Sequence, residues 1–439
     1  MNGNNTMRLA VFKVDITPPI GFPLAYGVNN KIDSHIYMSG IILDDGNKRI
    51  VFVSADVIGI SGDAHIYLRK IIAKASETSV SNVFLHAVHQ HDSIRIKFNF
   101  ECVAKAHGIE PFIIKDFFDG IMKKIVDAVK KSVSDKWVSI VDIGTSESRL
   151  SGLASNRRLL DENGKVHAMR WSMTCDKDLQ DEPVGVIDPI LRTLTFNNKQ
   201  GKPVAALHFY ASHPMAAYRR NMVGADVPGV ARDYAGKHYG KDVLNIYFNG
   251  CGGNVTFGKF AINPPEKSLK ILGERLGKGI IRNLNSYDRH PVSKIKIKKA
   301  SFEIPFMTKI ERDRVYRAFP DDKVASIIVE EWTNLKKEWD KWRKVEISRI
   351  SIGDDIHILS MFGETVVEYQ LYAQSLIPEK FLACAAYSNS IYDYIPTAIM
   401  FDEGGYETDA GSFTTPDIEL LYKEAIKKVL EEPICKILT

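Results

Sequence analysis

The chain has 439 residues, and its 58 Lys and Arg side chains exceed its 54 Asp and Glu side chains to give a formal net charge of +4. Apolar residues make up 45% and charged residues 26%, a composition that excludes collagen-like and intrinsically disordered chains. The small positive excess is spread along the chain, and its densest run, Lys294–Lys298, alternates with apolar residues as in an edge strand. We therefore expect no binding to nucleic acid.

The 5 cysteines are scattered without any Cys-x-x-Cys spacing, which predicts neither a disulfide framework nor a thiolate zinc site. The N-terminus is polar and rich in asparagine, whereas a secretory signal needs an apolar core of about 7–15 residues. No stretch reaches the roughly 18 apolar residues of a membrane span. These features together predict a cytoplasmic protein without stable membrane anchoring.

The order of apolar patterns along the chain predicts one domain over residues 1–439, because no repeat or long linker interrupts it. Strands are predicted at residues 49–55, 82–89, 137–143, 203–211, 243–249, 294–304, 356–361 and 381–387. Apolar residues three and four positions apart predict helices around residues 118–129 and 269–280. This interleaving predicts an α/β fold with mixed β-sheets.

One further predicted helix carries an aromatic stripe. Its apolar face consists of Ile328, Trp332, Leu335, Trp339 and Trp342, at helical spacings. The stripe is typical of a helix that packs on the core or on a partner subunit, and the second reading would make the protein a homo-oligomer. A wall that faces the substrate is the alternative.

The apolar run at residues 83–88 turns abruptly polar at His89-Gln90-His91. Strand alternation would place His89 and His91 on one face and His86 on the other. Imidazole nitrogen is a common zinc ligand, so the pair indicates a metal site at a strand end. Ordinary surface or core histidines remain the alternative.

A second histidine follows another predicted strand. Pro214 lacks a backbone donor and should end that strand, which leaves His213 at its polar tip. The residue types alone leave a ligand and an ordinary histidine equally open.

Two further segments place polar or glycine residues just beyond predicted strands. Gly250-Cys251-Gly252-Gly253 permits close approach of a ligand or presents amides to an oxyanion, although a simple turn is the alternative. The segment lacks the ending of a nucleotide-binding P-loop, so it does not predict phosphate binding. Glu364 follows Gly363 and could be a metal ligand or a carboxylate at a helix N-terminus.

Taken in order, these elements resemble the neutral/alkaline non-lysosomal ceramidase family, whose catalytic domain is a zinc-dependent amidase. The likeness extends from Val14-Asp15-Ile16-Thr17-Pro18, which is similar to the family's opening segment, to Tyr406. His89-Gln90-His91 matches the family's His-Thr-His signature, and Gly363-Glu364-Thr365 matches its Gly-Glu-Phe motif. The resemblance implies a ceramidase-like α/β catalytic domain.

The resemblance also implies the zinc ligands, which are His89, His213, Glu364 and Tyr394. The spacing to Tyr406 favours Tyr394 over Tyr392 as the tyrosine ligand. His91 corresponds to a residue beside the reacting bond, where it would transfer a proton to the leaving nitrogen.

The remaining site residues also follow from this resemblance. Arg157 would hold the substrate's polar head or the developing oxyanion, with Arg158 as an alternative. Thr256 and Asn254 fall in the family's Gly-Asp-Val-Ser loop, where Thr256 would donate a hydrogen bond or act as nucleophile, and Asn254 would contact the substrate. Asp226 would orient a substrate group or a metal ligand, although a helix cap is an equal alternative.

The function that follows is hydrolysis of an amide bond in a small-molecule substrate by zinc-activated water. The chain ends about 30 residues beyond Tyr406, so we expect a catalytic domain without the immunoglobulin-like domain of secreted members. No amphipathic basic anchor is evident, which favours a soluble substrate over ceramide. The alternatives are a metal-dependent hydrolase or lyase acting on a sugar or polyol derivative, and a binding protein without turnover.

Overall fold

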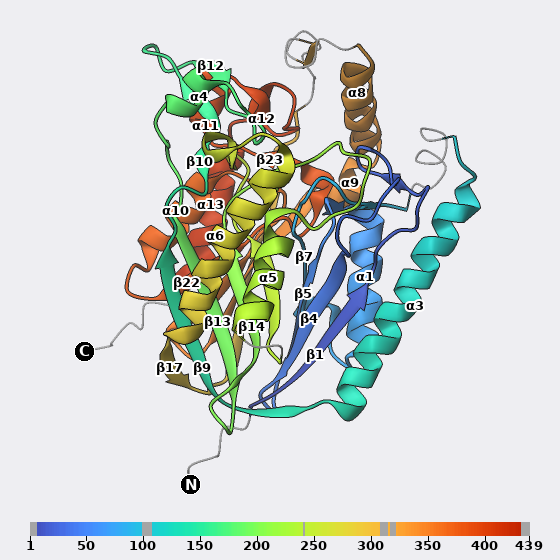
Figure 1. Cartoon of the computed structure of the whole chain (residues 1–439), viewed down its shortest axis with the longest axis vertical. Coiled ribbons are helices and arrows are strands. Elements are labelled where there is room, and N and C mark those ends of the chain that lie inside the picture. The colour runs from blue at the N-terminus through green and yellow to red at the C-terminus, as the bar shows by residue number, and fades with distance from the viewer. Residues whose placement is uncertain (1–6, 99–107, 240–241, 308–314, 317–321, 432–439) are drawn as a thin grey trace.

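The computed structural model describes residues 7–98, 108–239, 242–307, 315–316 and 322–431. Two β-sheets pack face to face, and helices cover their outer faces, so the fold has an α–β–β–α layering (Figure 1). The apolar side chains between the sheets form one cluster, and those beneath the helices form two others. The predicted α/β fold with mixed sheets is confirmed.

The large sheet has the strand order β15-β14-β13-β9-β1-β4-β5-β7, with β17 paired to β9. Its strands are β1 Met7–Asp15, β4 Tyr37–Asp44, β5 Arg49–Ala55, β7 Val83–Ala87, β9 Val138–Arg149, β13 Ile190–Asn198, β14 Pro203–Tyr210, β15 Leu244–Asn249 and β17 Asp288–Pro291. The pairs β5–β7 and β14–β15 are parallel, whereas the other pairs are antiparallel. The apolar patterns did not predict β1, β4, β13 and β17, and they placed the end of β9 at residue 143 instead of 149.

The small sheet has the strand order β18-β19-β20-β22. Its strands are β18 Ile295–Glu303, β19 Lys344–Ile352, β20 Ile356–Ser360 and β22 Phe381–Ala385. β20 and β22 run parallel. The basic run Lys294–Lys298 lies at the start of β18, which is an edge strand as its alternation predicted.

Alternation along the strands divides the side chains between the layers. In β14, Leu207 and Phe209 face the cluster between the sheets, whereas Ala206 and Tyr210 face the cluster beneath the helices. Both faces are buried, because a sheet covered on each side has no solvated face. This explains why β14 reads as a continuous apolar run.

Helices pack on the outer faces (Figure 1). They are α1 Gly62–Ala75 and α3 Pro111–Asp135 on one half of the large sheet, α5 Asp226–His238 and α6 Pro265–Asn285 on its other half, and α10 Val367–Leu376 and α13 Ile418–Leu430 on the small sheet's side. The stripes predicted within residues 118–129 and 269–280 are buried, in α3 and α6. Proline at the first turn of α3 and α6 marks where each helix begins.

Short strand pairs and helices join these layers at one end of the fold. The pairs are β2 Pro23–Leu24 with β3 Gly27–Val28, β6 Gly59–Ile60 with β8 Arg95–Ile96, β10 Ser155–Asn156 with β16 Val255–Thr256, β11 Arg158–Leu160 with β12 Val166–Met169, and β21 Glu364–Thr365 with β23 Tyr394–Ile395. The short helices are α4 Lys177–Asp181, α11 Ala398–Glu403 and α12 Tyr406–Asp409.

The helix predicted to carry the aromatic stripe is interrupted at Glu338. It consists of α8 Asp322–Lys337 and α9 Trp339–Trp342. Trp342 is buried, and the ring of Trp339 lies 4.1 Å from that of Phe306, centroid to centroid. This part of the stripe therefore packs within the chain, as the core interpretation predicted.

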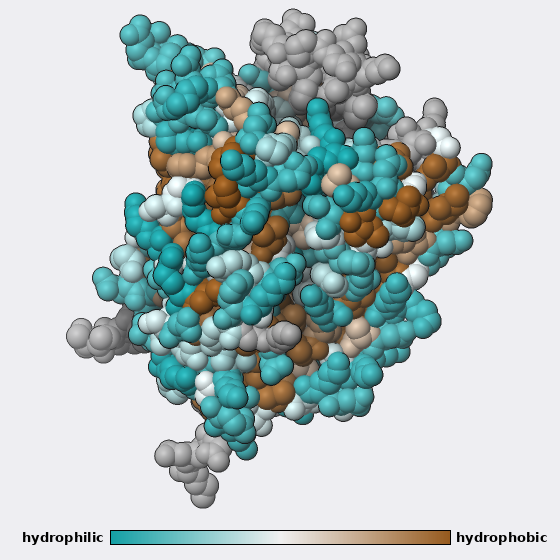
Figure 2. Space-filling view, in the orientation of Figure 1, coloured by the Kyte–Doolittle hydropathy of each residue, from teal (hydrophilic) through white to brown (hydrophobic). Residues whose placement is uncertain are grey.

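Figure 2 shows a largely hydrophilic face on which apolar side chains gather near the N-terminal end of α3. Phe112 is 60% exposed and Ile113 is 45% exposed there. Among the described residues, no helix combines the length and apolar character needed to cross a membrane. Cys175, Cys251 and Cys384 are free thiols.

Candidate metal centre

The parallel strand pairs of both sheets end close together, and the predicted ligands lie just beyond these ends. His89 follows β7, His213 follows β14, and Glu364 follows β20. Side chains beyond the carboxyl ends of parallel strands commonly form the functional site of an α/β fold. The ring centroids of His89 and His213 are 4.9 Å apart, so the fold brings these two predicted ligands together.

A short parallel ladder adds the predicted tyrosine. Glu364 in β21 is the register partner of Tyr394 in β23. The turn before Glu364 needs glycine, because Gly363 has φ +68° and a Cβ there would lie 2.9 Å from the Asp393 carbonyl oxygen. The Tyr394 hydroxyl lies 3.0 Å from Nε2 of His213.

Backbone carbonyls fix the orientation of both histidine rings. Nδ1 of His89 lies 2.6 Å from the Ile58 carbonyl oxygen, and Nδ1 of His213 lies 2.6 Å from the Gly252 carbonyl oxygen. A carbonyl can only accept a hydrogen bond, so each Nδ1 carries the proton. In the neutral ring, Nε2 then presents a lone pair.

These lone pairs point at one carboxylate oxygen. Oε2 of Glu364 lies 3.2 Å from Nε2 of His89 and 3.1 Å from Nε2 of His213. Three electron-pair donors in contact repel one another unless a cation or proton lies between them. All three side chains are buried, which makes an uncompensated contact costly. The donor set fits a divalent cation such as zinc.

His91 completes a cluster of imidazoles. The ligand nitrogens of His89, His91 and His213 lie within 4.8 Å of one another and could hold a metal ion. Both ring nitrogens of His91 are buried without a hydrogen-bond partner among the described residues. The geometry thus leaves His91 free either to bind the ion or to hold a proton beside it.

The backbone conformation at His89 differs from the extended strand that the sequence predicted. Simple strand alternation was expected to align His89 with His91, but β7 ends at Ala87 and His89 has a left-handed backbone with φ +77°. Such a conformation costs roughly 1–3 kcal/mol and persists only where the surroundings enforce it. Tyr387, with φ +62°, shares this strain and stacks on the His89 ring at 4.5 Å.

Burial keeps the imidazoles of His213 and His91 neutral. It lowers the pKa of His213 to about 4 and the pKa of His91 well below its usual range, and neighbouring histidines reinforce the shift of His91. Burial alone would raise the pKa of Glu364, but its surroundings in the cluster outweigh burial and hold that pKa well below its usual value. Neutral imidazoles beside an ionised carboxylate are the protonation states that bind a metal ion.

The glycine-rich turn after β15 lets backbone segments pack closely behind the ligands. A Cβ on Gly252 would lie 2.9 Å from the Ser212 backbone, and one on Gly253 would lie 2.5 Å from the Glu364 carbonyl oxygen. The turn therefore holds His213 and Glu364 in place. Its role is structural support, whereas the sequence had also left open a direct contact with a ligand.

Arg157 lies beside Tyr394, with its guanidinium carbon 5.2 Å from the tyrosine ring centroid. Its Nε donates to Glu407 at 2.7 Å, and the neighbouring Arg158 donates to the other oxygen of Glu407 at 2.8 Å. Nη2 of Arg157 is buried without a hydrogen-bond partner among the described residues. Sequence reasoning missed Glu407, although it belongs to the Tyr-Glu pair that set the register of Tyr394.

Thr256 and Asn254 have their side chains engaged within the protein. The Thr256 hydroxyl donates to the Arg170 carbonyl at 3.1 Å and accepts from the Gly258 amide at 3.2 Å. Asn254 donates to both oxygens of Glu368, at 3.1 and 2.9 Å. None of these hydrogen bonds involves the histidine cluster, so the described contacts favour support of the loop.

Asp226 begins α5 and binds the segment that follows His213. Its carboxylate accepts from the amides of Ala216 and Ala217 at 3.1 and 3.2 Å and from the Val227 amide at 2.7 Å. Burial raises its pKa to about 6 despite these hydrogen bonds. These contacts fit a role of Asp226 in orienting the segment that carries His213. None of the hydrogen bonds described for Asp226 reaches the histidine cluster.

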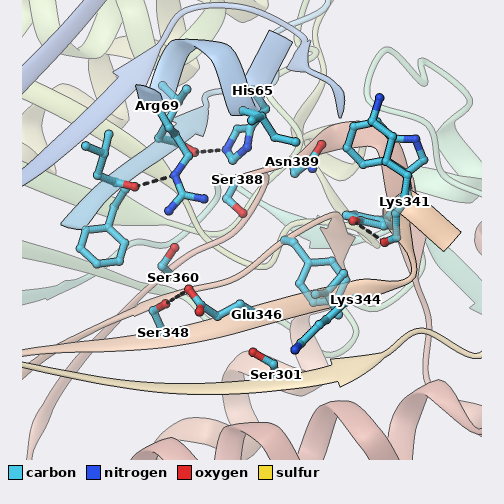
Figure 3. A pocket seen from close by; sticks show the side chains of 18 residues that line it. His65, Arg69, Ser301, Lys341, Lys344, Glu346, Ser348, Ser360, Ser388 and Asn389 are labelled. Atoms are coloured by element: carbon cyan, nitrogen blue, oxygen red, sulfur yellow. Dashed lines mark hydrogen bonds between the residues drawn. The ribbon is translucent and has the colours of Figure 1, made fainter. Parts of the chain in front are cut away.

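A cavity of about 340 Å³ lies between α1, β7 and the small sheet (Figure 3). Its charged groups largely have partners: Arg69 donates to the carbonyls of Val80 and Val83, Glu346 pairs with Lys299, and Lys341 pairs with Asp63. The buried ring nitrogens of His89 and His91 that lack a hydrogen-bond partner contrast with these balanced groups. The histidine cluster is therefore the stronger candidate for the functional site.

Two solved structures are similar to the chain in fold. The neutral ceramidase from Pseudomonas aeruginosa matches with a TM-score of 0.68 and 14% identity, over 97% of this chain and 74% of that one. A ceramidase complexed with C2 matches with a TM-score of 0.68 and 13% identity, over 96% of this chain and 74% of that one. No family profile and no curated protein sequence matches the chain. Since the likeness spans both sheets and the strand ends that carry the histidines, the chain has a neutral ceramidase-like fold.

Proposed function

We propose that the protein is a zinc-dependent hydrolase that cleaves the amide bond of a soluble N-acyl substrate. The observation that carries the proposal is the convergence of Nε2 of His89 and Nε2 of His213 on Oε2 of Glu364, at 3.2 and 3.1 Å. The ceramidase-like fold supports it, since the neighbours are ceramidases by name and ceramide is an amide.

His89, His213, Glu364 and Tyr394 would hold the ion. A bound zinc ion supplies a Lewis acid that polarises a carbonyl and lowers the pKa of water to about 7. The carbonyls of Ile58 and Gly252 keep Nε2 of each histidine ligand unprotonated, which is the state that binding requires.

The residues around the cluster would serve the substrate. His91 lies beside the other imidazoles with free ring nitrogens, so it can hold a proton for the leaving nitrogen of the amide. Arg157 keeps one buried guanidinium nitrogen unpaired and can stabilise the oxyanion that forms at the carbonyl. Thr256 is better placed to support the loop than to attack the carbonyl.

The test combines metal analysis with hydrolysis of short and long N-acyl substrates. His213→Ala should lose the bound metal and the turnover together, because it removes a ligand whose ring is 0% exposed. The matched control is His208→Gln in β14, since the ring nitrogens of His208 bond to Thr193 and Asn245 and not to the cluster. Full metal content in folded His213→Ala would refute the ligand assignment.

A further inference from the structure

Tyr26 and Tyr218 pack on the buried ring of His91, and the exposed Arg219 packs on both tyrosines. We refer to Tyr26, Tyr218 and Arg219 as the entrance to the metal centre, because they lie between His91 and the solvent. The Tyr26 ring is nearly parallel to the His91 ring, at 7° and 5.3 Å between centroids, and the Tyr218 ring meets it edge-on at 5.7 Å. The Arg219 guanidinium carbon lies 5.2 Å from the Tyr26 ring and 5.6 Å from the Tyr218 ring. Arg219 is exposed, so its charge faces the solvent side of the site.

Backbone contacts hold this entrance in a defined shape. Tyr26 lies in the turn between β2 and β3, and a Cβ on the adjacent Gly27 would lie 2.1 Å from Oδ1 of Asn221. The same oxygen accepts a hydrogen bond from the Val28 amide at 3.3 Å. Arg219 has φ +61°, a left-handed conformation that costs energy in a non-glycine residue. The chain thus places this guanidinium against the two tyrosines at a cost in free energy.

Arg219 and its neighbour Arg220 differ in their ion pairs. The adjacent Arg220 pairs with Asp92 at 2.7 Å and with Asp33 at 3.2 Å. Arg219 forms no ion pair with any residue in the described parts of the chain. The one carboxylate in the histidine cluster, Glu364, already contacts the imidazoles. The entrance therefore has a guanidinium that is free to bind an anion.

We propose that the substrate carries an anionic group, a carboxylate or a phosphate, which binds Arg219 at this entrance. The inference rests on the proposed amide hydrolysis and names its substrate class. A guanidinium presents a planar pair of donors that matches either anion, and contact with aromatic rings reduces the entropy lost when it binds. Because Arg219 contacts the two tyrosines that pack on His91, the anion belongs within a few bonds of the amide, as in N-acyl amino acids and N-acyl amino phosphates.

The experiment compares substrates with and without an anionic group. The first pair is a series of N-acylglycines, from acetyl to dodecanoyl, and the matching N-acylglycinamides. The second pair is N-acylphosphoethanolamine and N-acylethanolamine, which distinguishes a phosphate from a carboxylate. For each compound, kcat, KM and the dissociation constant by calorimetry are measured. We expect the anionic member of at least one pair to bind about 10- to 100-fold more tightly.

Two variants test the residue. Arg219→Gln should remove the preference for the anion mainly through KM, and Arg219→Lys should restore part of it. The matched control is Arg289→Gln. Arg289 lies in β17, in another part of the large sheet, and its guanidinium carbon is 5.2 Å from the ring centroid of Tyr287, the residue before this strand. This control should leave the preference intact.

The outcomes separate this inference from the proposed function. Hydrolysis of charged and neutral compounds with equal efficiency would overturn the anion site and leave the amidase intact. Binding of the anion that depends on Arg219 without any turnover would support the anion site and count against the amidase. Absence of both binding and turnover across all compounds would overturn the inference.

Discussion

Glu364 and Tyr394 face each other in a two-residue parallel ladder, and both side chains reach Nε2 of His213. Backbone pairing of β21 with β23 thus assembles two ligand candidates from different parts of the chain. A third strand end supplies His213 itself. The geometry of the site therefore depends on how closely these backbone segments approach, and several variants test this dependence.

Gly253→Ala should weaken metal binding by about 10-fold or more, because the new Cβ would lie 2.5 Å from the Glu364 carbonyl oxygen and must displace it. Metal titration of the apoprotein measures the change. Gly236→Ala in α5 is the matched control, since a Cβ there meets no atom within 4 Å. Unchanged metal affinity in Gly253→Ala would show that the glycine turn does not position Glu364.

Thr256 tests whether its hydroxyl supports the loop or attacks the substrate. Thr256→Ser should keep both hydrogen bonds of the hydroxyl and therefore the metal content and the stability. Thr256→Val should lower the free energy of unfolding by about 1–3 kcal/mol, because the Gly258 amide loses its acceptor. Denaturant unfolding with metal analysis checks both. A Thr256→Val protein of native stability and no turnover would instead indicate a direct catalytic role.

Glu407 carries the charge that balances two buried guanidinium groups. Glu407→Gln should lower the free energy of unfolding by roughly 3–5 kcal/mol, because the buried guanidinium groups of Arg157 and Arg158 would lose their shared carboxylate. Chemical denaturation measures the loss. Glu77→Gln is the control: this Glu side chain is 71% exposed and pairs with Arg49, so the change should cost at most about 1 kcal/mol. Equal losses in the two variants would contradict the prediction.

Asp226 should make stability depend on pH. Its pKa rises from 3.8 to about 6 on folding, so between these values the unfolded chain releases the proton while the folded chain keeps it. Ionisation thus favours the unfolded state, and this contribution to stability falls as pH rises through the window and levels off above it. The loss is on the order of 1–3 kcal/mol. It should be absent in Asp226→Asn, and a difference between the two proteins that is constant from pH 4 to pH 7 would contradict this.

The sequence by itself determined the α/β class, most of the strands around the site and the candidates His89, His91, His213 and Glu364. These depend on local patterns, because an apolar run that turns polar marks a strand end wherever the strand lies. Interpreting these candidates together came from the resemblance to ceramidases, since no spacing in the chain shows that they meet.

Only the tertiary structure decided which groups meet. It paired Arg157 with Glu407, stacked Tyr387 on His89, placed the Thr256 hydroxyl on a backbone carbonyl, and set Arg219 over two tyrosines. Apart from the contact of Arg219 with its neighbour Tyr218, these contacts join segments distant in sequence, and several need a left-handed backbone that local propensity disfavours. Such conformations form only where packing of the whole fold compensates their cost, so residue patterns cannot reveal them.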